Sequence, residues 1–274
     1  MRAEQAVERV WPGRQAALEQ LGGGITNHNF KVVVDGEAFV LRIGGKDTEL
    51  LGIDRRHEHA ASLAAAAVGV GPEVVAFVEP EGYLVTRFID GRPIAPDRMP
   101  VADVGRTLRL VHGGQPIPSR FDPFRIVEAY RQTAEEHGVP IPSVYPEARL
   151  RAEAIAARRG PHALCLCHND LLNANFLDDG RRLRIVDWEY AGMGDRFFDL
   201  ANFAVNHGLD DAGEQALLEA YFGEARDGDL ATLHDMRFMS DFREAMWGVV
   251  QQGISDLDFD FVAYANEHFE RALA

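Results

Sequence analysis

Two short apolar runs near the middle of the chain each lead directly into polar residues. Residues 163–167 run into His168-Asn169-Asp170, and residues 183–186 end at Asp187. Runs of this length, bounded by polar and turn-forming residues, are typical of buried strands. Residues 177–181, LDDGR, indicate a turn between them. The sequence therefore predicts a strand, a polar loop, a hairpin and a second acidic residue in close succession.

The polar residues of this segment follow a recognisable spacing. Residues 168–175 read H-x-D-L-x-x-x-N, and the acidic residue at 187 follows an apolar run. This is the spacing of a kinase catalytic loop and its metal-binding aspartate. In such a site one carboxylate orients the acceptor hydroxyl, while an amide and a second carboxylate hold magnesium. The alternative is an ordinary hairpin whose loop happens to be polar.

Composition narrows the class of partner. The chain has 274 residues and a formal net charge of −15, which disfavours binding to nucleic acid or to an anionic membrane surface. A cationic small molecule would be favoured. No apolar run approaches the ~20 residues needed to span a bilayer, so we expect no membrane insertion. Residues 1–20 are charged and lack the apolar core of a signal peptide, so we expect a cytoplasmic protein.

The chain contains two cysteines, Cys165 and Cys167. As alternate residues of one predicted strand they face the same side, which makes a structural disulfide between them unfavourable. A metal site would need more ligands than this pair provides.

The first third of the chain alternates between strand and turn signals. Residues 54–68 form an alanine-rich predicted helix, which residues 69–72 terminate. The predicted β structure comprises a strand, glycine-rich turn and strand over residues 21–34, and further strands at 38–43, 74–78 and 83–88.

Asp90-Gly91-Arg92-Pro93 interrupts this pattern and marks the predicted boundary between two lobes. We expect an α+β fold with a small, antiparallel β-rich N-terminal lobe at residues 1–89. Residues 90–274 would form a larger, mainly helical lobe, interrupted by the polar hairpin. A nucleotide would bind in the cleft between the lobes.

Three segments together resemble the choline/ethanolamine kinase family, within the aminoglycoside-phosphotransferase-like branch of the protein-kinase-like fold. They are GGGITNHNFKV, HNDLLNANFL with VDWEYAGMGDRFFDLANF, and AMWGVVQQGISDLDFDFVAYANEHFERA. The resemblance covers the chain from about Gly22 to the C-terminus. It implies a two-lobed kinase that uses ATP as co-substrate and Mg²⁺ as cofactor, with a small cationic amino alcohol such as choline or ethanolamine as acceptor.

The resemblance assigns roles to the residues of the polar hairpin. Asp170 takes the position of the catalytic base, which accepts the hydroxyl proton. Asn175 and Asp187 match the two positions that hold magnesium, and their hard oxygen ligands suit that ion. His168 is expected to brace the loop rather than to take part in chemistry. Asp199 is also expected to brace the loop, although Asp195 and Asp199 could both be helix caps.

The N-terminal lobe would supply the nucleotide-binding residues. Gly22, Gly23 and Gly24 with Thr26 and Asn27 resemble a phosphate-covering loop, although a glycine-rich hairpin turn alone is weak evidence. Arg42 stands where kinases usually carry a strand lysine, as in the choline kinase pattern, and can grip phosphate oxygens. Glu58 is the candidate ion-pair partner of Arg42; the alternative for it is a solvated helix face.

The resemblance also assigns residues to the acceptor pocket. Tyr190 and Trp247 match aromatic pocket residues of the family, which suit a quaternary ammonium. Two positions depart from the pattern: Glu244 replaces a second tryptophan, and Asn206 replaces an acidic residue. Glu244 lies one helical turn from Trp247 and could face the same cavity. A carboxylate there leaves ethanolamine open as well as choline. The alternative for the aromatic residues is core packing.

Two further patterns do not indicate sites. His57, Glu58 and His59 splay apart on a helix and cannot converge on a metal. Lys46 follows two glycines but lacks the remainder of a phosphate-loop pattern, so we interpret it as a loop lysine.

Two other functions stay open at this point. One is a kinase for another small hydroxylated metabolite, such as an aminoglycoside or thiamine. The other is a nucleotide-binding pseudokinase without catalytic activity; the joint presence of Asp170, Asn175 and Asp187 argues against it.

Overall fold

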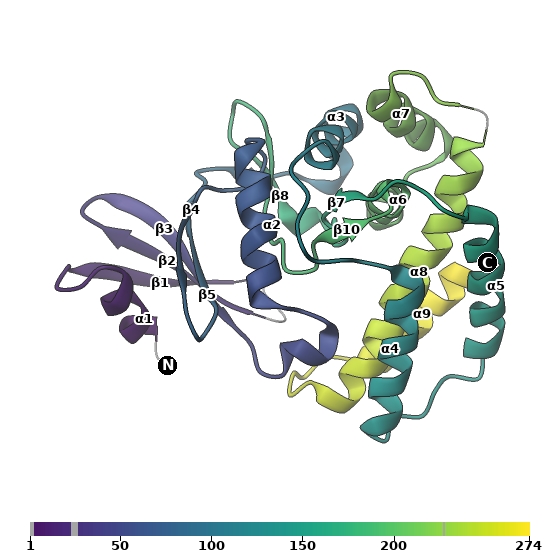
Figure 1. Ribbon diagram of the computed structural model, residues 1–274, viewed down its shortest axis with the longest axis horizontal. Coiled ribbons are helices and arrows are strands. Elements are labelled where there is room, and N and C mark those ends of the chain that lie inside the picture. Colours follow the sequence, from purple (N-terminus) through teal and green to yellow (C-terminus); the bar gives the residue numbers. More distant parts are fainter. Residues whose placement is uncertain (1–2, 23–26, 227) are drawn as a thin grey trace.

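A small β-rich lobe lies beside a larger helical lobe, with the N-terminus in the first and the C-terminus at the far side of the second (Figure 1). The structure is a computed structural model, and it describes residues 3–22, 27–226 and 228–274. The predicted α+β fold with an antiparallel N-terminal sheet and a helical C-terminal lobe is confirmed. The lobe boundary at residues 89 and 90 stays a prediction.

The N-terminal lobe is built on a five-stranded antiparallel sheet with the order β1-β2-β3-β5-β4. Its strands are β1 (Ala16–Leu21), β2 (Asn27–Val34), β3 (Glu37–Gly44), β4 (Val74–Val78) and β5 (Tyr83–Arg87). The prediction that the first strand begins at Leu21 was wrong: β1 ends there. In this edge strand the polar residues Glu19 and Gln20 are exposed. The strand therefore lacks the apolar pattern from which a buried strand is recognised in a sequence.

Two helices accompany the sheet. The helix α1 (Ala3–Val10) buries Ala6 and Val7 in the core of the small lobe with Val32 and Leu41. The helix α2 (Arg55–Ala67) stands between the sheet and the helical lobe (Figure 1). Asp54 caps α2 by accepting the backbone N–H groups of residues 56 and 57, as expected for an aspartate at this position.

The predicted polar hairpin is present, with shorter strands than expected. The loop that begins at His168 follows β7 (Cys165–Cys167), and Asp187 follows β9 (Leu183–Ile185). A short strand, β8 (Phe176–Asp178), pairs with β9, so the turn starts at Asp179 rather than at Leu177. One strand was not predicted: β10 (Gly192–Gly194) pairs with β7. A side chain at Gly192 would meet the backbone of Phe121, which explains the glycine at this position.

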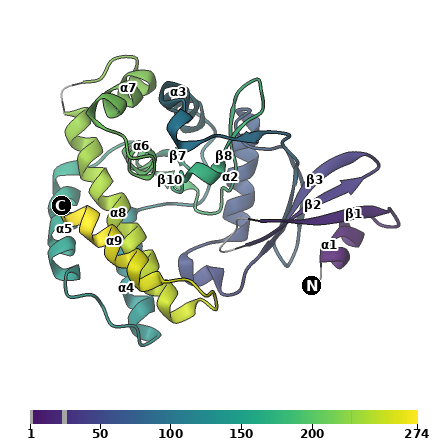
Figure 2. The same cartoon turned by 180° about the vertical axis from the view of Figure 1, so that it is seen from behind.

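The remaining elements form the helical lobe. The long helix α8 (Asp229–Ile254) packs against α4, α6 and α9, and Figure 2 shows α9 lying along it. Within the part of the chain that the structure describes, no helix is long and apolar enough to cross a membrane. The other elements are α3 (Val101–His112), α4 (Pro123–Glu136), α5 (Tyr145–Arg159), α6 (Arg196–Asn206), α7 (Asp211–Phe222), α9 (Phe261–Leu273), the short strand β6 (Arg92–Pro93) and 3-10 turns at Thr48–Leu51, Pro96–Arg98 and Asn173–Asn175.

Candidate active site

The loop after β7 is held in place by a carboxylate from α6. Asp199 accepts the backbone N–H of His168 at 2.8 Å and that of Asn169 at 2.7 Å. Asn169 has a φ of 67°, in the left-handed region that few residues other than glycine adopt. Asp199 is fully buried, so it fixes a strained backbone directly before Asp170. This contact fits the predicted bracing role of Asp199 and not the alternative of a helix cap.

Asp195 is the residue that caps α6. Its carboxylate accepts the backbone N–H of Phe197 at 3.0 Å and also pairs with Arg159. The two aspartates that the sequence analysis treated together therefore have different surroundings.

Asp170, Asn175 and Asp187 lie close together in the structure, as their spacing predicts. The amide nitrogen of Asn175 donates to the backbone oxygen of Asp170 at 2.8 Å and to its carboxylate at 3.3 Å. The backbone N–H of Val186 donates to the Asn175 carbonyl at 3.0 Å, which draws Asp187 toward the loop. Asp187 itself has a φ of 68°.

The three side chains offer ligand atoms that suit a hard cation. The Asn175 amide nitrogen is taken up by Asp170, so its oxygen is the atom left to face a metal. Asp187 uses one carboxylate oxygen toward Arg42 and keeps the other. Amide and carboxylate oxygens are preferred by Mg²⁺. The donor set therefore fits the predicted ion.

The environment of Asp170 makes its carboxyl group a stronger base. Burial raises the pKa of Asp170 well above its usual range, and Arg243 opposes this shift, while Glu244, Asp187 and Glu189 reinforce it. A base whose pKa is raised toward the working pH accepts a proton more readily.

His168 has the surroundings of a structural residue. Its Nε2 hydrogen-bonds with the carbonyl of Val186 at 2.9 Å, and the backbone N–H of Asp170 donates to its Nδ1 at 3.2 Å. Its ring lies edge-on to Trp188, and burial lowers the pKa of His168. A neutral ring that joins the two halves of the hairpin fits the predicted bracing role.

Arg42 connects the N-terminal lobe to Asp187. Its Nη1 lies 2.5 Å from Asp187 Oδ1 and 2.9 Å from Glu58 Oε1. Glu58 is only 1% exposed, so its alternative as a solvated helix residue was wrong. These contacts raise the pKa of Arg42 further above its usual range, although burial opposes the shift.

The ion-pair chain continues beyond Glu58 through two residues that the sequence analysis missed. Arg55 pairs with Glu58 at 2.7 Å and with Glu189 at 3.2 Å, and Glu189 accepts the Asn27 amide at 2.8 Å. Glu189 lies two residues after Asp187, in the segment that carries the family resemblance, and this position could have drawn attention to it.

A pocket lies between the lobes where the nucleotide is predicted. Residues of β2, β3 and β5 line one side of it, and Asn175, Leu177 and Asp187 line the other. Arg42 and Glu58 also border it. Gly23, Gly24 and Thr26 of the predicted phosphate-covering loop lie outside the described residues. Asn27 is described, and it is buried against Glu189. Lys46 lies in a loop beside Asp47, at 3.6 Å.

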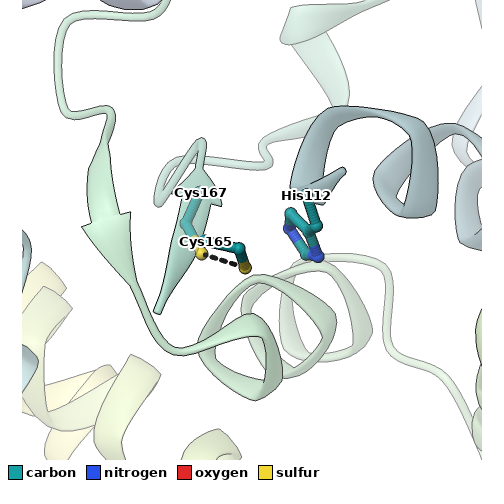
Figure 3. Close-up of side chains that lie close together, drawn as sticks. All are labelled: His112, Cys165 and Cys167. Carbon is teal, nitrogen blue, oxygen red and sulfur yellow. Dashed lines mark hydrogen bonds between the residues drawn. The ribbon is translucent and has the colours of Figure 1, made fainter. Parts of the chain in front are cut away.

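The two cysteines are free thiols whose sulfur atoms lie 3.7 Å apart. The sequence offered no further ligand near them, but the fold brings His112 of α3 to the same place (Figure 3). Its ring nitrogens bond to Asp199 at 3.0 Å and to the Tyr221 hydroxyl at 2.8 Å. His112 therefore contacts Asp199, whose carboxylate holds the loop before Asp170.

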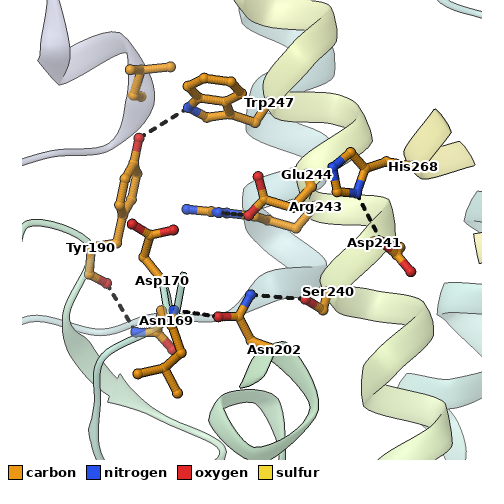
Figure 4. A network of polar contacts seen from close by, with 12 residues as sticks. Asn169, Asp170, Tyr190, Asn202, Ser240, Asp241, Arg243, Glu244, Trp247 and His268 are labelled. Carbon is orange, nitrogen blue, oxygen red and sulfur yellow. Dashed lines mark hydrogen bonds and ion pairs between the residues drawn. The ribbon is translucent and has the colours of Figure 1, made fainter. Parts of the chain in front are cut away.

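Tyr190 and Trp247 lie next to each other near Asp170 (Figure 4). The indole N–H of Trp247 donates to the Tyr190 hydroxyl at 3.1 Å. Trp247 also packs against Phe261 and Tyr264, and it is 7% exposed, so it belongs to the core as well. Both the pocket role and the packing role are compatible with this position.

Glu244 lies near Trp247, as its helical spacing predicts, and it is paired on both sides. It forms an ion pair with Arg243 and accepts the Tyr264 hydroxyl at 2.9 Å. Sequence reasoning missed Arg243 and Tyr264. An adjacent Arg and Glu directly before the apolar run at residues 245–250 of α8 was the available signal for Arg243.

Comparison with known proteins agrees with this architecture. A mouse ethanolamine kinase 2 is 23% identical over 300 residues, which cover 95% of this chain and 77% of that protein. A choline/ethanolamine kinase family protein from Mesorhizobium loti has a solved structure with 33% identity and a TM-score of 0.83, covering 100% of this chain and 94% of the other.

The choline kinase LicA from Streptococcus pneumoniae shares the fold, with a TM-score of 0.83 at 21% identity over 98% of this chain and 95% of the other. The model of the phosphotransferase enzyme family (APH) matches residues 17–238, most of the chain. By this match and by the Mesorhizobium relative, the chain belongs to the phosphotransferase enzyme family and, within it, to the choline/ethanolamine kinase family.

Proposed function

We propose that this protein transfers the γ-phosphate of ATP to the hydroxyl of a small amino alcohol, choline or ethanolamine, with Mg²⁺ as cofactor. The observation that carries the proposal is the convergence of Asp170, Asn175 and Asp187 beside Arg42 at the cleft between the lobes. The relatives named for ethanolamine and choline support the acceptor class.

In this proposal Asp170 acts on the acceptor. Its carboxylate, with a raised pKa, accepts the proton of the hydroxyl and directs the oxygen toward the γ-phosphorus. Asp199 and His168 act through the backbone, because they hold the loop in the conformation that presents Asp170. Such positioning contributes much of the rate in phosphoryl transfer, where the protein does little covalent chemistry.

The N-terminal lobe orients the nucleotide. Arg42 donates to phosphate oxygens while Glu58 keeps its guanidinium in place. Asn175 and Asp187 would hold Mg²⁺, and the bound ion would neutralise charge on the phosphates. The glycine-rich segment with Gly23, Gly24, Thr26 and Asn27 is proposed to cover the phosphates.

The acceptor is proposed to bind between Asp170 and the side chains of Tyr190, Glu244 and Trp247. The aromatic faces suit a quaternary ammonium, whereas the carboxylate of Glu244 suits a primary one. The cytoplasmic location remains a prediction.

An acceptor panel tests the proposal. ADP release is measured with ATP and Mg²⁺ against choline, ethanolamine, methylated ethanolamines, thiamine and an aminoglycoside. We expect release with an amino alcohol, and its loss when EDTA removes the metal. ADP release with thiamine or the aminoglycoside alone would show that the acceptor is that metabolite and not an amino alcohol. Nucleotide binding without release on any acceptor would indicate a pseudokinase.

A further inference from the structure

The guanidinium of Arg243 occupies the region where the acceptor is proposed to bind. Arg243 is 1% exposed, and its central carbon lies 4.5 Å from the centre of the Tyr190 ring. Figure 4 shows the side chain reaching from α8 into the space between Tyr190 and Asp170. The proposed acceptor site thus already contains a cation stacked on the Tyr190 ring.

Two nitrogen donors of Arg243, Nε and Nη2, are not used in its ion pair with Glu244. Its Nη1 pairs with Glu244, but Nε and Nη2 are buried and have no hydrogen-bond partner in the part of the chain that the structure describes. The hydroxyl of the nearby Tyr130 donates to the carbonyl of Leu51, and its oxygen can accept from only one of these donors. Buried donors without an acceptor are costly, most of all on a charged group. A ligand that brings oxygen acceptors to this fork would remove that cost.

The same geometry weakens the binding of an acceptor whose only charged group is a cation. One face of Tyr190 is covered by the guanidinium, and the Glu244 carboxylate is neutralised by Arg243 and hydrogen-bonded by Tyr264. A quaternary ammonium would have to displace Arg243 from both. Asp170, Glu189 and Asp187 still add negative charge around the site, so an ammonium group on the acceptor remains favourable.

We propose that the acceptor is a hydroxy amino acid, whose carboxylate binds the free donors of Arg243 while its hydroxyl faces Asp170. This inference rests on the proposed phosphotransfer and defines its substrate class. An arginine fork matches the two oxygens of a carboxylate. In the reaction a bond forms between the acceptor oxygen and the γ-phosphorus, the bond from that phosphorus to the bridging oxygen breaks, ADP leaves, and the hydroxyl proton passes to Asp170.

A matched pair of acceptors tests the inference, since L-serine is ethanolamine with one added carboxylate. We expect kcat/KM for L-serine to exceed that for ethanolamine by about 10- to 100-fold, the range for a hydrogen bond to a charged group. L-Serinamide, which keeps the shape and the ammonium but lacks the charge, should behave as ethanolamine does. L-Homoserine and choline complete the series.

The variant Arg243→Met should abolish the preference for L-serine over ethanolamine. The double variant Arg243→Met with Glu244→Gln should do the same, and it removes the Glu244 carboxylate that Arg243→Met alone leaves without its ion-pair partner. Arg158→Met is the control: Arg158 forms an exposed pair with Asp235 on α8, and the variant should keep the wild-type ratio.

The outcomes separate this inference from the proposed function. Turnover of ethanolamine or choline with less turnover of L-serine would overturn the hydroxy amino acid but leave the kinase intact. An equal fall in kcat for all acceptors in Arg243→Met would also overturn it, because Arg243 would then act on the phosphoryl group. If no acceptor is phosphorylated, the proposed function fails, and calorimetry with a non-hydrolysable ATP analogue decides the inference: tighter binding of L-serine than of ethanolamine supports it, and equal binding overturns it.

Discussion

The carboxylate of Asp199 on α6 accepts the backbone N–H of Asn169 at 2.7 Å, in the loop that presents Asp170. The second carboxylate oxygen accepts the N–H of His168 at 2.8 Å. Asn169 holds a left-handed backbone conformation that costs roughly 1 kcal/mol or more without such support. One buried side chain therefore fixes the backbone directly before Asp170, the proposed base.

Asp199→Asn should lower both stability and turnover. The amide nitrogen would face one of the two backbone N–H groups and leave it without an acceptor, at a cost of about 2 kcal/mol. A displaced loop should reduce kcat by about 10- to 100-fold. Urea unfolding and steady-state kinetics measure the two effects. Asp195→Asn is the control: asparagine still caps α6, the variant removes only the charge that pairs with Arg159, and kcat should stay unchanged. An unchanged kcat in Asp199→Asn would show that the loop holds its position without this contact.

Asp170→Asn and Asp170→Ala should keep the fold and ATP binding but lose turnover by about 10²- to 10⁴-fold, the usual contribution of a general base. Burial and neighbouring carboxylates raise the pKa of Asp170. The ionised side chain therefore costs stability at neutral pH, and Asp170→Asn should melt at the same or a higher temperature than the wild type.

Steady-state kinetics, nucleotide binding and thermal melting are measured on the same preparations of the Asp170 variants. Together they test whether turnover is lost while nucleotide binding and stability are kept. Asp178→Asn, at an exposed position on the far end of the hairpin, should change neither turnover nor nucleotide binding. Near-normal turnover in Asp170→Asn would exclude this residue as the base.

Arg42→Lys should be far milder than Arg42→Met. A single nitrogen, Nη1, makes the contacts to Asp187 and to Glu58, so one ammonium group can replace both. Arg42→Met leaves both carboxylates uncompensated, and we expect its KM for ATP to rise by about tenfold or more while the acceptor KM changes little. Initial rates with each substrate varied in turn give the two constants. Equal defects in the lysine and methionine variants would mean that the fork of the guanidinium is required.

Trp247→Phe and Trp247→Ala should raise the KM of the acceptor much more than that of ATP. Phenylalanine preserves much of the packing against Phe261 and Tyr264 but loses the N–H that bonds to Tyr190. Phe269→Leu, at a buried position of α9, should lower stability without changing either constant. Unchanged acceptor KM values in folded Trp247 variants would assign this residue to the core alone.

His112 should make stability depend on alkaline pH. Burial lowers the pKa of His112, but the hydrogen bonds to Asp199 and Cys165 outweigh it and raise the pKa to about 9. A folded-state pKa above the unfolded value of about 6.5 means that the charge stabilises the protein fully below about pH 6.5 and that this contribution is lost as pH rises through 9.

The variant His112→Gln isolates this charge, because glutamine retains a neutral donor toward Asp199. The wild type should be more stable than the variant by up to about 3 kcal/mol at pH 6, and the difference should shrink toward pH 9.5. Urea unfolding across this range measures it. A difference that does not vary with pH would show that the ring is neutral throughout.

Local patterns were sufficient to predict the hairpin and the convergence of its polar residues. Asp170, Asn175 and Asp187 lie within 18 positions of one another, and short strands with a tight turn leave few ways to arrange them. The helix that starts after Asp54 was equally predictable, since its cap and its alanine-rich face are both local. The exposed edge strand β1 was misplaced because its polar residues do not alternate clearly with apolar ones.

The chemistry of the site depends on contacts that no local pattern contains. Arg42 meets Asp187 across 145 positions, Asn27 meets Glu189 across 162, and His112 of α3 meets the two cysteines of β7. Such contacts arise only when the two lobes and the helices pack against each other. The sequence by itself determined the local arrangement of the residues that we propose to carry phosphotransfer. Only the tertiary structure decided that Arg243 lies beside Tyr190 and Asp170, where the acceptor is proposed to bind, because the direction of a buried side chain is set by the packing around it.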